Sequence, residues 1–150
     1  METLDRQVKQ VIILDKSKGC NTGKYVSQGA HASLGALLKM FTKLIHTDAN
    51  ETYTVCSARF GENSILDKWL NGIFTKICLA ANTEEEMMDI YHKVVEYNQQ
   101  HEGDEQIPVV LIEDCGKTCF HGEKTKTAVG IGPFWSDIID RFTGELKLFR

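Results

Sequence analysis

Three lysines near the start of the chain, Lys16, Lys18 and Lys24, are the first residues whose types and spacing could do chemistry. They separate a short β-branched run from a long segment with the apolar periodicity of a helix. Asn21 or Thr22 can cap that helix, which places Lys24 in its first turn. Acidic residues are favoured there by about 0.3–1 kcal/mol each, so a lysine is locally unfavourable. Lysines beside a helix start favour an anion site; the alternative is a solvated surface loop.

A second loop rich in reactive groups lies in the C-terminal half, at residues 113–127, EDCGKTCFHGEKTKT. It combines the carboxylate of Asp114 with the hydroxyl groups of Thr118 and Thr127. The loop follows a predicted strand, and ligand sites of open α/β sheets lie just outside the carboxyl ends of strands. We therefore expect a ligand site here. The lysines of this loop are Lys117, Lys124 and Lys126.

The cysteines do not indicate a metal centre. Their odd number and the absence of C-x-x-C pairs predict free thiols in a reducing compartment. Cys115, Cys119 and His121 are close in sequence, but they lack a second ligand pair at zinc spacing. We expect neither a metal nor another cofactor. The five cysteines are Cys20, Cys56, Cys78, Cys115 and Cys119.

Length and charge fit one ordinary globular domain over residues 1–150. A net charge of -4 argues against a wholly basic nucleic-acid-binding protein but allows a local basic face. The N-terminal METLDRQVKQ is charged and has no apolar core of a signal peptide. No apolar run approaches the roughly 18 residues of a membrane span. We expect a soluble, cytoplasmic protein with no membrane partner.

The elements that must position these loops alternate along the chain, which predicts an α/β fold. Residues 46–63 interrupt the helical period and read as a long loop or insertion, with a short strand as an option at 53–56. Ser64 and Thr83 are expected N-caps, and Thr83 with Glu86 has the spacing of a capping box. Strands are expected at 11–14, 73–80, 109–112, 128–131 and 146–149, and helices at 22–45, 65–71, 83–97 and 134–142.

Two common kinds of catalytic motif fit poorly. Gly19, Gly23 and Lys24 lie between a strand and a helix, as in a nucleotide-binding phosphate loop, but the spacing is short and Tyr25 replaces the hydroxyl that holds magnesium. No G-x-S-x-G turn indicates a serine nucleophile. His31 lies one turn along the first helix, where it is either a hydrogen-bonded packing residue or a base.

Four motifs resemble the signature of the type 2 peptidyl-tRNA hydrolase family. Their order and the elements between them also agree with that family, and together they cover nearly the whole chain. They are G-K-x-x-x-Q-x-x-H-A at residues 23–32, D-x-G-[KR]-T at 114–118, T-x-x-x-I-G-P at 127–133 and T-G-x-L-K-L at 143–148.

The resemblance implies a three-layer sandwich with a four-stranded mixed β-sheet between helices. It implies hydrolysis of the ester that links a peptide to the 3′ end of tRNA, with peptidyl-tRNA as partner. We also consider association of two copies of the chain as a homodimer. Its catalytic residues fall on Lys24, Asp114, Thr118 and Thr127. Either Lys16 or Lys18 takes the family's basic position before the helix. The expected substrate-binding residues are Lys16, Lys18, Gln28, His31, Lys117, Lys124 and Lys126.

Ester hydrolysis needs an activated water and a group that stabilises the oxyanion. We expect Asp114 to orient or deprotonate the water, with Thr118 as a relay. Lys24 is expected to stabilise the oxyanion or the leaving 3′ oxygen. The remaining lysines would form a phosphate-binding rim. The alternative function is that of a catalytically silent RNA- or protein-binding relative with the same fold.

Overall fold

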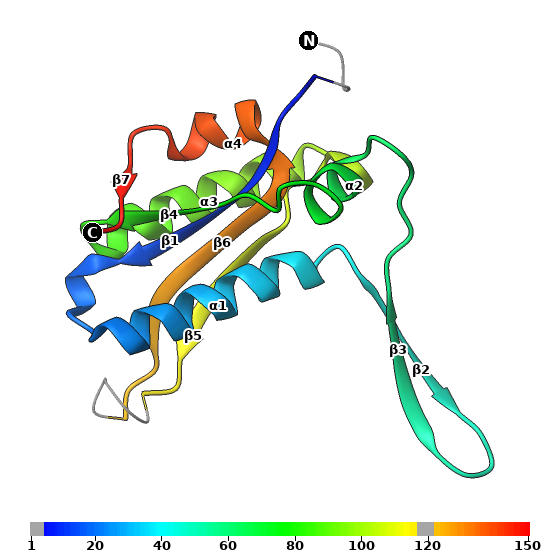
Figure 1. Ribbon diagram of the computed structural model, residues 1–150. Coiled ribbons are helices and arrows are strands. Elements are labelled where there is room, and N and C mark those ends of the chain that lie inside the picture. The colour runs from blue at the N-terminus through cyan, green and yellow to red at the C-terminus, as the bar shows by residue number, and fades with distance from the viewer. Residues whose placement is uncertain (1–4, 117–121) are drawn as a thin grey trace.

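The computed structural model describes residues 5–116 and 122–150. Within them lie seven strands, four α-helices and two 3-10 turns (Figure 1). In chain order these are β1 (Val8–Asp15), the 3-10 turn Lys16–Lys18, α1 (Thr22–Leu38), β2 (Thr42–Thr47), β3 (Thr52–Ser57), α2 (Ile65–Leu70), β4 (Lys76–Ala81), α3 (Glu84–Gln99), the 3-10 turn Gly103–Glu105, β5 (Val109–Asp114), β6 (Thr125–Trp135), α4 (Ser136–Thr143) and β7 (Lys147–Leu148).

Five of the strands in the described part of the chain form one mixed sheet, in the order β5-β6-β1-β4-β7. β1 is parallel to β4, whereas the β1–β6, β5–β6 and β4–β7 pairs are antiparallel. The resemblance implied a sheet of four strands, whereas the observed sheet has five. The fifth strand is β7, whose Leu148 pairs with Leu79 at the edge of the sheet.

Helices cover both faces of this sheet, as the α/β prediction requires. α1 lies on one face and α3 and α4 lie on the other (Figure 1). Alternate residues of β1 belong to the two cores: Ile12 and Leu14 pack with Ala32 of α1, and Ile13 packs with Met87 of α3. This alternation follows from the two-residue period of a strand.

α1 lies unusually close to the sheet, because glycine and alanine meet at the contact. A Cβ atom on Gly130 of β6 would lie 2.2 Å from the carbonyl oxygen of Ala32. Gln10 of β1, which is fully buried, donates hydrogen bonds to the carbonyl oxygens of Ser33 and Gly132. These contacts fix the position of α1 over β6, and thereby the position of the side chains at its N-terminal end.

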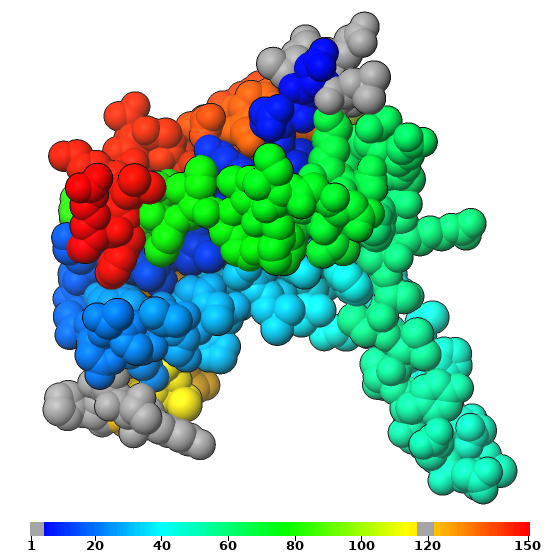
Figure 2. Space-filling model, viewed as in Figure 1, coloured from blue at the N-terminus to red at the C-terminus, as the bar shows by residue number. Residues whose placement is uncertain are grey.

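The long first helix was predicted to reach residue 45, and this prediction is wrong. α1 ends at Leu38, and the chain then forms the antiparallel hairpin β2–β3 instead of a long loop; the optional strand at 53–56 lies within β3. Phe41 and Ile45 continue the helical spacing by coincidence, since half of residues 42–47 are β-branched and favour strands: Thr42, Ile45 and Thr47. Figure 2 shows the hairpin projecting away from the body of the molecule.

The end of the sheet also differs from the sequence prediction. β6 continues beyond residue 131 because Phe134 and Trp135 pair with β1, so α4 begins only at Ser136. The predicted caps are confirmed: the hydroxyl groups of Ser64 and Thr83 accept hydrogen bonds from the backbone N–H groups three residues later. Among the described residues, no helix is long and apolar enough to span a membrane.

Candidate active site

Lys24 lies in the first turn of α1, as predicted. The N-cap is Asn21, whose Oδ1 accepts a hydrogen bond of 2.9 Å from the backbone N–H of Lys24. The first turn contains no acidic residue, so no side chain of that turn balances the ammonium group. The side chain of Lys24 is 16% exposed, which leaves part of it open to solvent at the surface.

Asp114, the last residue of β5, is the partner that Lys24 meets. Lys24 Nζ lies 2.6 Å from Asp114 Oδ2, which also accepts a hydrogen bond of 3.0 Å from Gln28 Nε2. The other carboxylate oxygen accepts a hydrogen bond of 2.7 Å from the backbone N–H of Gly116. Gly116 has a φ of 79°, a conformation that glycine adopts without strain. The two separate loops singled out in the sequence therefore meet at one ion pair.

These contacts keep Asp114 ionised. The hydrogen bond from Lys24 is the largest cause that lowers the pKa of the Asp114 carboxyl below its ordinary range, and the Gly116 N–H adds to it. Burial of the carboxyl acts in the opposite direction but is outweighed. The site thus holds a carboxylate and an ammonium group side by side at neutral pH.

Thr127 reaches the same site through a β-bulge in β6. Ile112 pairs with Ala128 and Glu113 pairs with Lys126, so Thr127 is an extra residue without a partner on β5. A bulge changes the direction in which a side chain points. Thr127 can therefore reach α1, although the next residue, Ala128, also packs in the core beneath α1.

Gln28 connects the carboxylate to the threonine. Its Nε2 donates to Asp114, and its Oε1 accepts a hydrogen bond of 2.6 Å from the Thr127 hydroxyl. Gln28 is 2% exposed and Thr127 is 1% exposed. The nitrogen and the oxygen of the Gln28 amide therefore both form their hydrogen bonds inside the protein. In this arrangement Gln28 contacts the carboxylate of Asp114 rather than solvent, whereas the sequence prediction placed it among the substrate-binding residues.

The lysines before α1 lie in different surroundings. Lys18 Nζ is 2.9 Å from Glu84 and 3.5 Å from the buried carboxylate of Asp15. Burial alone would lower the pKa of Lys18, but the hydrogen bond to Glu84 and the charge of Asp15 outweigh it and raise that pKa. Lys16 is exposed in the 3-10 turn. Of the two lysines, Lys16 is thus the one whose side chain is turned to solvent.

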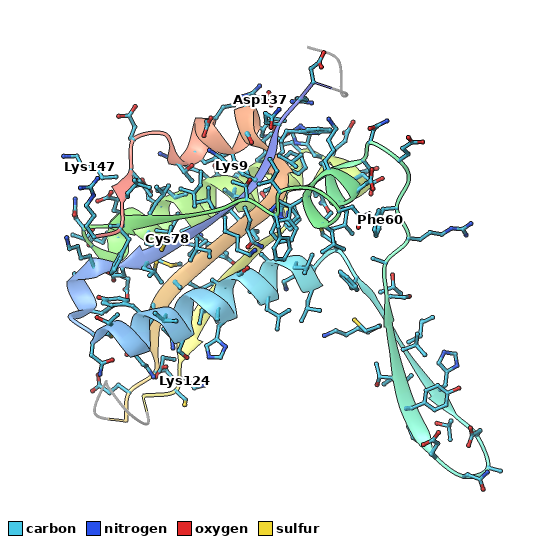
Figure 3. The ribbon with its side chains drawn as sticks, in the orientation of Figure 1. Lys9, Phe60, Cys78, Lys124, Asp137 and Lys147 are labelled. Atoms are coloured by element: carbon cyan, nitrogen blue, oxygen red, sulfur yellow. The ribbon has the colours of Figure 1, made fainter. Side chains whose placement is uncertain are left out.

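The remaining predicted residues lie around the site or outside the described part of the chain. His31 is exposed on α1, one turn beyond Gln28. Lys124 is exposed where the chain enters β6, near the N-terminal half of α1 (Figure 3), and Lys126 follows it on β6. The residues of the second loop that lie outside the described residues are Lys117, Thr118, Cys119, Phe120 and His121.

Asp15 is a structural residue of this region that the sequence analysis did not identify. It is fully buried, and its Oδ1 accepts hydrogen bonds from both the backbone N–H and the hydroxyl of Ser17. Its carbonyl oxygen accepts a hydrogen bond of 2.9 Å from the Tyr25 hydroxyl, which ties the turn to α1. An aspartate two residues before a serine at the end of a strand is the available sequence signal for such a turn.

Comparison with known proteins identifies the family of this chain. The family model described as Peptidyl-tRNA hydrolase PTH2 matches residues 8–149. The peptidyl-tRNA hydrolase of Methanocaldococcus jannaschii is 32% identical over 141 residues, which are 94% of this chain and 99% of that protein. The peptidyl-tRNA hydrolase of Nanoarchaeum equitans is 32% identical over 142 residues, 95% of this chain and 99% of its own. The chain therefore belongs to the type 2 peptidyl-tRNA hydrolase family.

Proposed function

We propose that this chain hydrolyses the ester bond between a peptide, or an N-blocked amino acid, and the 3′ end of tRNA, which releases free tRNA. Membership of the family over residues 8–149 supports this function. The observation that carries the assignment of the site is the 2.6 Å ion pair between Lys24 Nζ and Asp114 Oδ2. It joins an ammonium group at a helix start to a carboxylate at the end of the edge strand β5.

The reaction joins a water oxygen to the carbonyl carbon, breaks the bond to the 3′ oxygen of tRNA and transfers a proton to that oxygen. Asp114 accepts a hydrogen bond from the attacking water and orients it. A general base works best when its pKa is near the operating pH. Because the pKa of Asp114 is lowered by Lys24, orientation of the water fits Asp114 better than full deprotonation.

Lys24 supplies the positive charge that stabilises negative charge developing in the transition state. Its ammonium group stabilises the oxyanion that forms at the ester carbonyl, or the 3′ oxygen as it leaves. A preorganised donor of this kind contributes about 3–4 kcal/mol to transition-state stabilisation. Gln28 and Thr127 act as positioning residues that hold the carboxylate in place, and Thr118 is the proposed relay on the second loop.

The test is a single-turnover assay with N-acetylated aminoacyl-tRNA. We expect the wild-type chain to release the N-acetylated amino acid, and Asp114→Asn to slow that release at least about 100-fold. Glu113→Gln is the matched control, since it removes the neighbouring, exposed carboxylate of β5, and it should change the rate less than about twofold. If the wild type binds this tRNA but does not release the N-acetylated amino acid, the chain is instead the catalytically silent relative.

The proposed function also sets the expected partners. Peptidyl-tRNA is the substrate, and the rim lysines contact its phosphate backbone without reading its sequence. We place the protein in the cytoplasm, where its substrate arises in translation. The proposed assembly is a homodimer.

A further inference from the structure

The hairpin β2–β3, which we call the arm (residues 42–57), forms a two-stranded sheet of its own. It projects from the body beyond the C-terminal end of α1 (Figures 1 and 2). The strand register places Leu44 opposite Val55 and His46 opposite Tyr53, so these four side chains share one face of the arm. The rings of His46 and Tyr53 stack with centroids 5.4 Å apart.

This face is apolar and exposed to solvent. Leu44 is 52% exposed, Tyr53 44% and Val55 40%. A hairpin of two strands is only marginally stable in water when nothing packs against it. An apolar face on a projecting element therefore indicates that another surface covers it.

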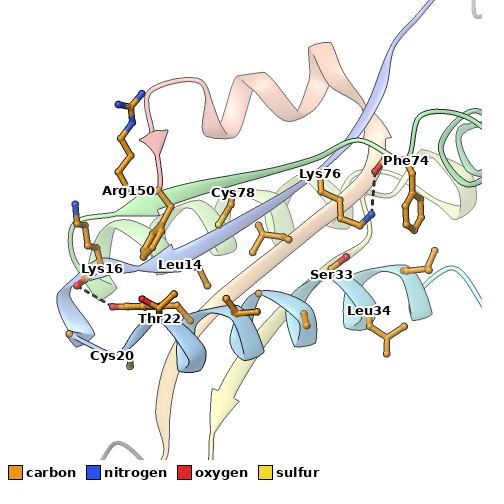
Figure 4. Close-up of a pocket in the computed structure, with 18 of the residues that line it drawn as sticks. Leu14, Lys16, Cys20, Thr22, Ser33, Leu34, Phe74, Lys76, Cys78 and Arg150 are labelled. Atoms are coloured by element: carbon orange, nitrogen blue, oxygen red, sulfur yellow. Dashed lines mark hydrogen bonds between the residues drawn. The ribbon is translucent and has the colours of Figure 1, made fainter.

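The same chain has an uncovered apolar groove of about 950 Å³. It lies between α1 and the strands β1 and β4, because α1 packs over β5, β6 and β1 and leaves β4 uncovered on that face (Figure 4). Its walls include Val26 and Leu34 of α1, which are 67% and 57% exposed, and Cys78 of β4. The groove lies on the side of α1 opposite Lys24, so it is separate from the ion pair of the active site.

Charge distinguishes the groove from the arm. Among the described residues that line the groove, the charged ones are Lys16, Lys76 and Arg150, all cationic. Lys16 and Arg150 lie at one end of the groove (Figure 4). The turn of the arm carries the carboxylates of Asp48 and Glu51. The arm therefore has an apolar face and an acidic tip, and the groove has apolar walls and cationic ends.

We propose that the arm of one chain lies in the groove of a second copy, and that two copies exchange arms in a symmetric dimer. The six-residue strands of the arm span roughly 20 Å and the 17-residue helix α1 roughly 25 Å, so the arm can follow most of the groove. The acidic tip lies at the Lys16 and Arg150 end. A two-fold axis makes both contacts at once, which covers both apolar surfaces of each chain.

RNA fits these surfaces less well than a second copy. The arm carries one lysine, Lys43, against the carboxylates of Asp48 and Glu51, so its formal charge is negative. Nucleic-acid contacts depend on neutralising phosphates with cations. An apolar, acidic arm instead matches an apolar, cationic groove.

The test compares dimerisation of matched variants by sedimentation velocity over a range of concentrations, without tRNA. Leu44→Asp alters the apolar face of the arm and Leu34→Asp alters the groove. Each should weaken the dimer at least about 30-fold, because a symmetric dimer contains each change twice. Ile45→Asp is the control for the arm, since Ile45 is 75% exposed on its opposite face, and Ser27→Asp is the control for α1 outside the groove.

A mixture of the two variants tests the exchange itself. In a dimer of one Leu44→Asp chain and one Leu34→Asp chain, the unchanged arm of the Leu34→Asp chain can enter the unchanged groove of the Leu44→Asp chain. We expect the mixed dimer to be tighter than either variant with itself. Circular dichroism and single-turnover ester hydrolysis on the same samples check that the variants are folded.

Several results would overturn the proposal. One is a wild-type chain that stays monomeric at every concentration, and another is a dimer that Leu44→Asp and Leu34→Asp leave unchanged. A mixture that associates no better than its components would exclude arm exchange. Loss of tRNA binding by Leu44→Asp with an unchanged dimer would make the arm an RNA-binding element. Dimerisation and ester hydrolysis are measured separately, so failure of one proposal is distinguishable from failure of the other.

Discussion

Replacement of Gln28 by leucine tests whether this residue positions the carboxylate or binds substrate. Leucine has a similar volume, so the change removes two hydrogen bonds without leaving a large cavity. Asp114 Oδ2 then keeps its Lys24 partner but loses the amide donor. The Thr127 hydroxyl loses an acceptor at 2.6 Å and retains only the carbonyl oxygen of Ile112 at 3.5 Å.

The magnitude follows from the charges and burial of these groups. A hydrogen bond to a charged group contributes about 1.5–3 kcal/mol, and a buried hydroxyl left without a good partner costs about 1–3 kcal/mol. Burial of the leucine side chain offsets part of this loss. We therefore expect the free energy of unfolding to fall by about 2–4 kcal/mol. Because Asp114 is less well held, kcat should fall about 10- to 100-fold.

The assay is steady-state hydrolysis of N-acetylated aminoacyl-tRNA, with urea denaturation of the same variant. A positioning role predicts a fall in kcat with KM changed less than about threefold, because Gln28 is 2% exposed and its amide is already bonded inside the protein. Ser27→Ala, on the exposed side of the same turn, should leave both constants unchanged. A raised KM with an unchanged kcat would refute this reasoning and restore Gln28 to the substrate-binding residues.

Three further predictions concern packing, pH and salt. Gly130→Ala places a Cβ atom 2.2 Å from the carbonyl oxygen of Ala32, so thermal and urea denaturation should show a loss of at least about 2 kcal/mol; unchanged stability would contradict the close contact. The folded-state pKa of Asp114 is lowered, so its stabilisation is complete above the unfolded pKa of about 3.9 and is lost as pH falls through the folded value. The difference in free energy of unfolding between the wild type and Asp114→Asn should therefore stay constant from about pH 7 to 5 and decrease below about pH 4, and a decrease already at pH 6 would contradict it. A phosphate-binding rim predicts that kcat/KM falls with salt on a log–log plot and that Lys124→Ala reduces the slope by about 1; a flat response would exclude the rim.

Local sequence signals identified much of the fold because they depend on neighbouring residues. Helix caps such as Thr83 need only a hydroxyl group and the N–H groups of the next turn. The central strands were recognisable from short β-branched and apolar runs. The apolar residues keep helical spacing as far as Ile45, although α1 ends at Leu38. The spacing alone therefore predicted a helix that was too long. The fifth strand, β7, lies within the strand expected at 146–149, but its two-residue length is set by its pairing with β4.

The sequence alone identified the candidate reactive residues and the α/β fold class. Lys24 was notable because a cation opposes the helix dipole, and Asp114 because it ends an apolar strand. Only the tertiary structure decided how these residues meet. The bulge at Thr127 arises from the register between β5 and β6, and the role of Gln28 arises from the close packing of α1 on Gly130. Both depend on how separate elements pair and pack, which residue spacing does not encode.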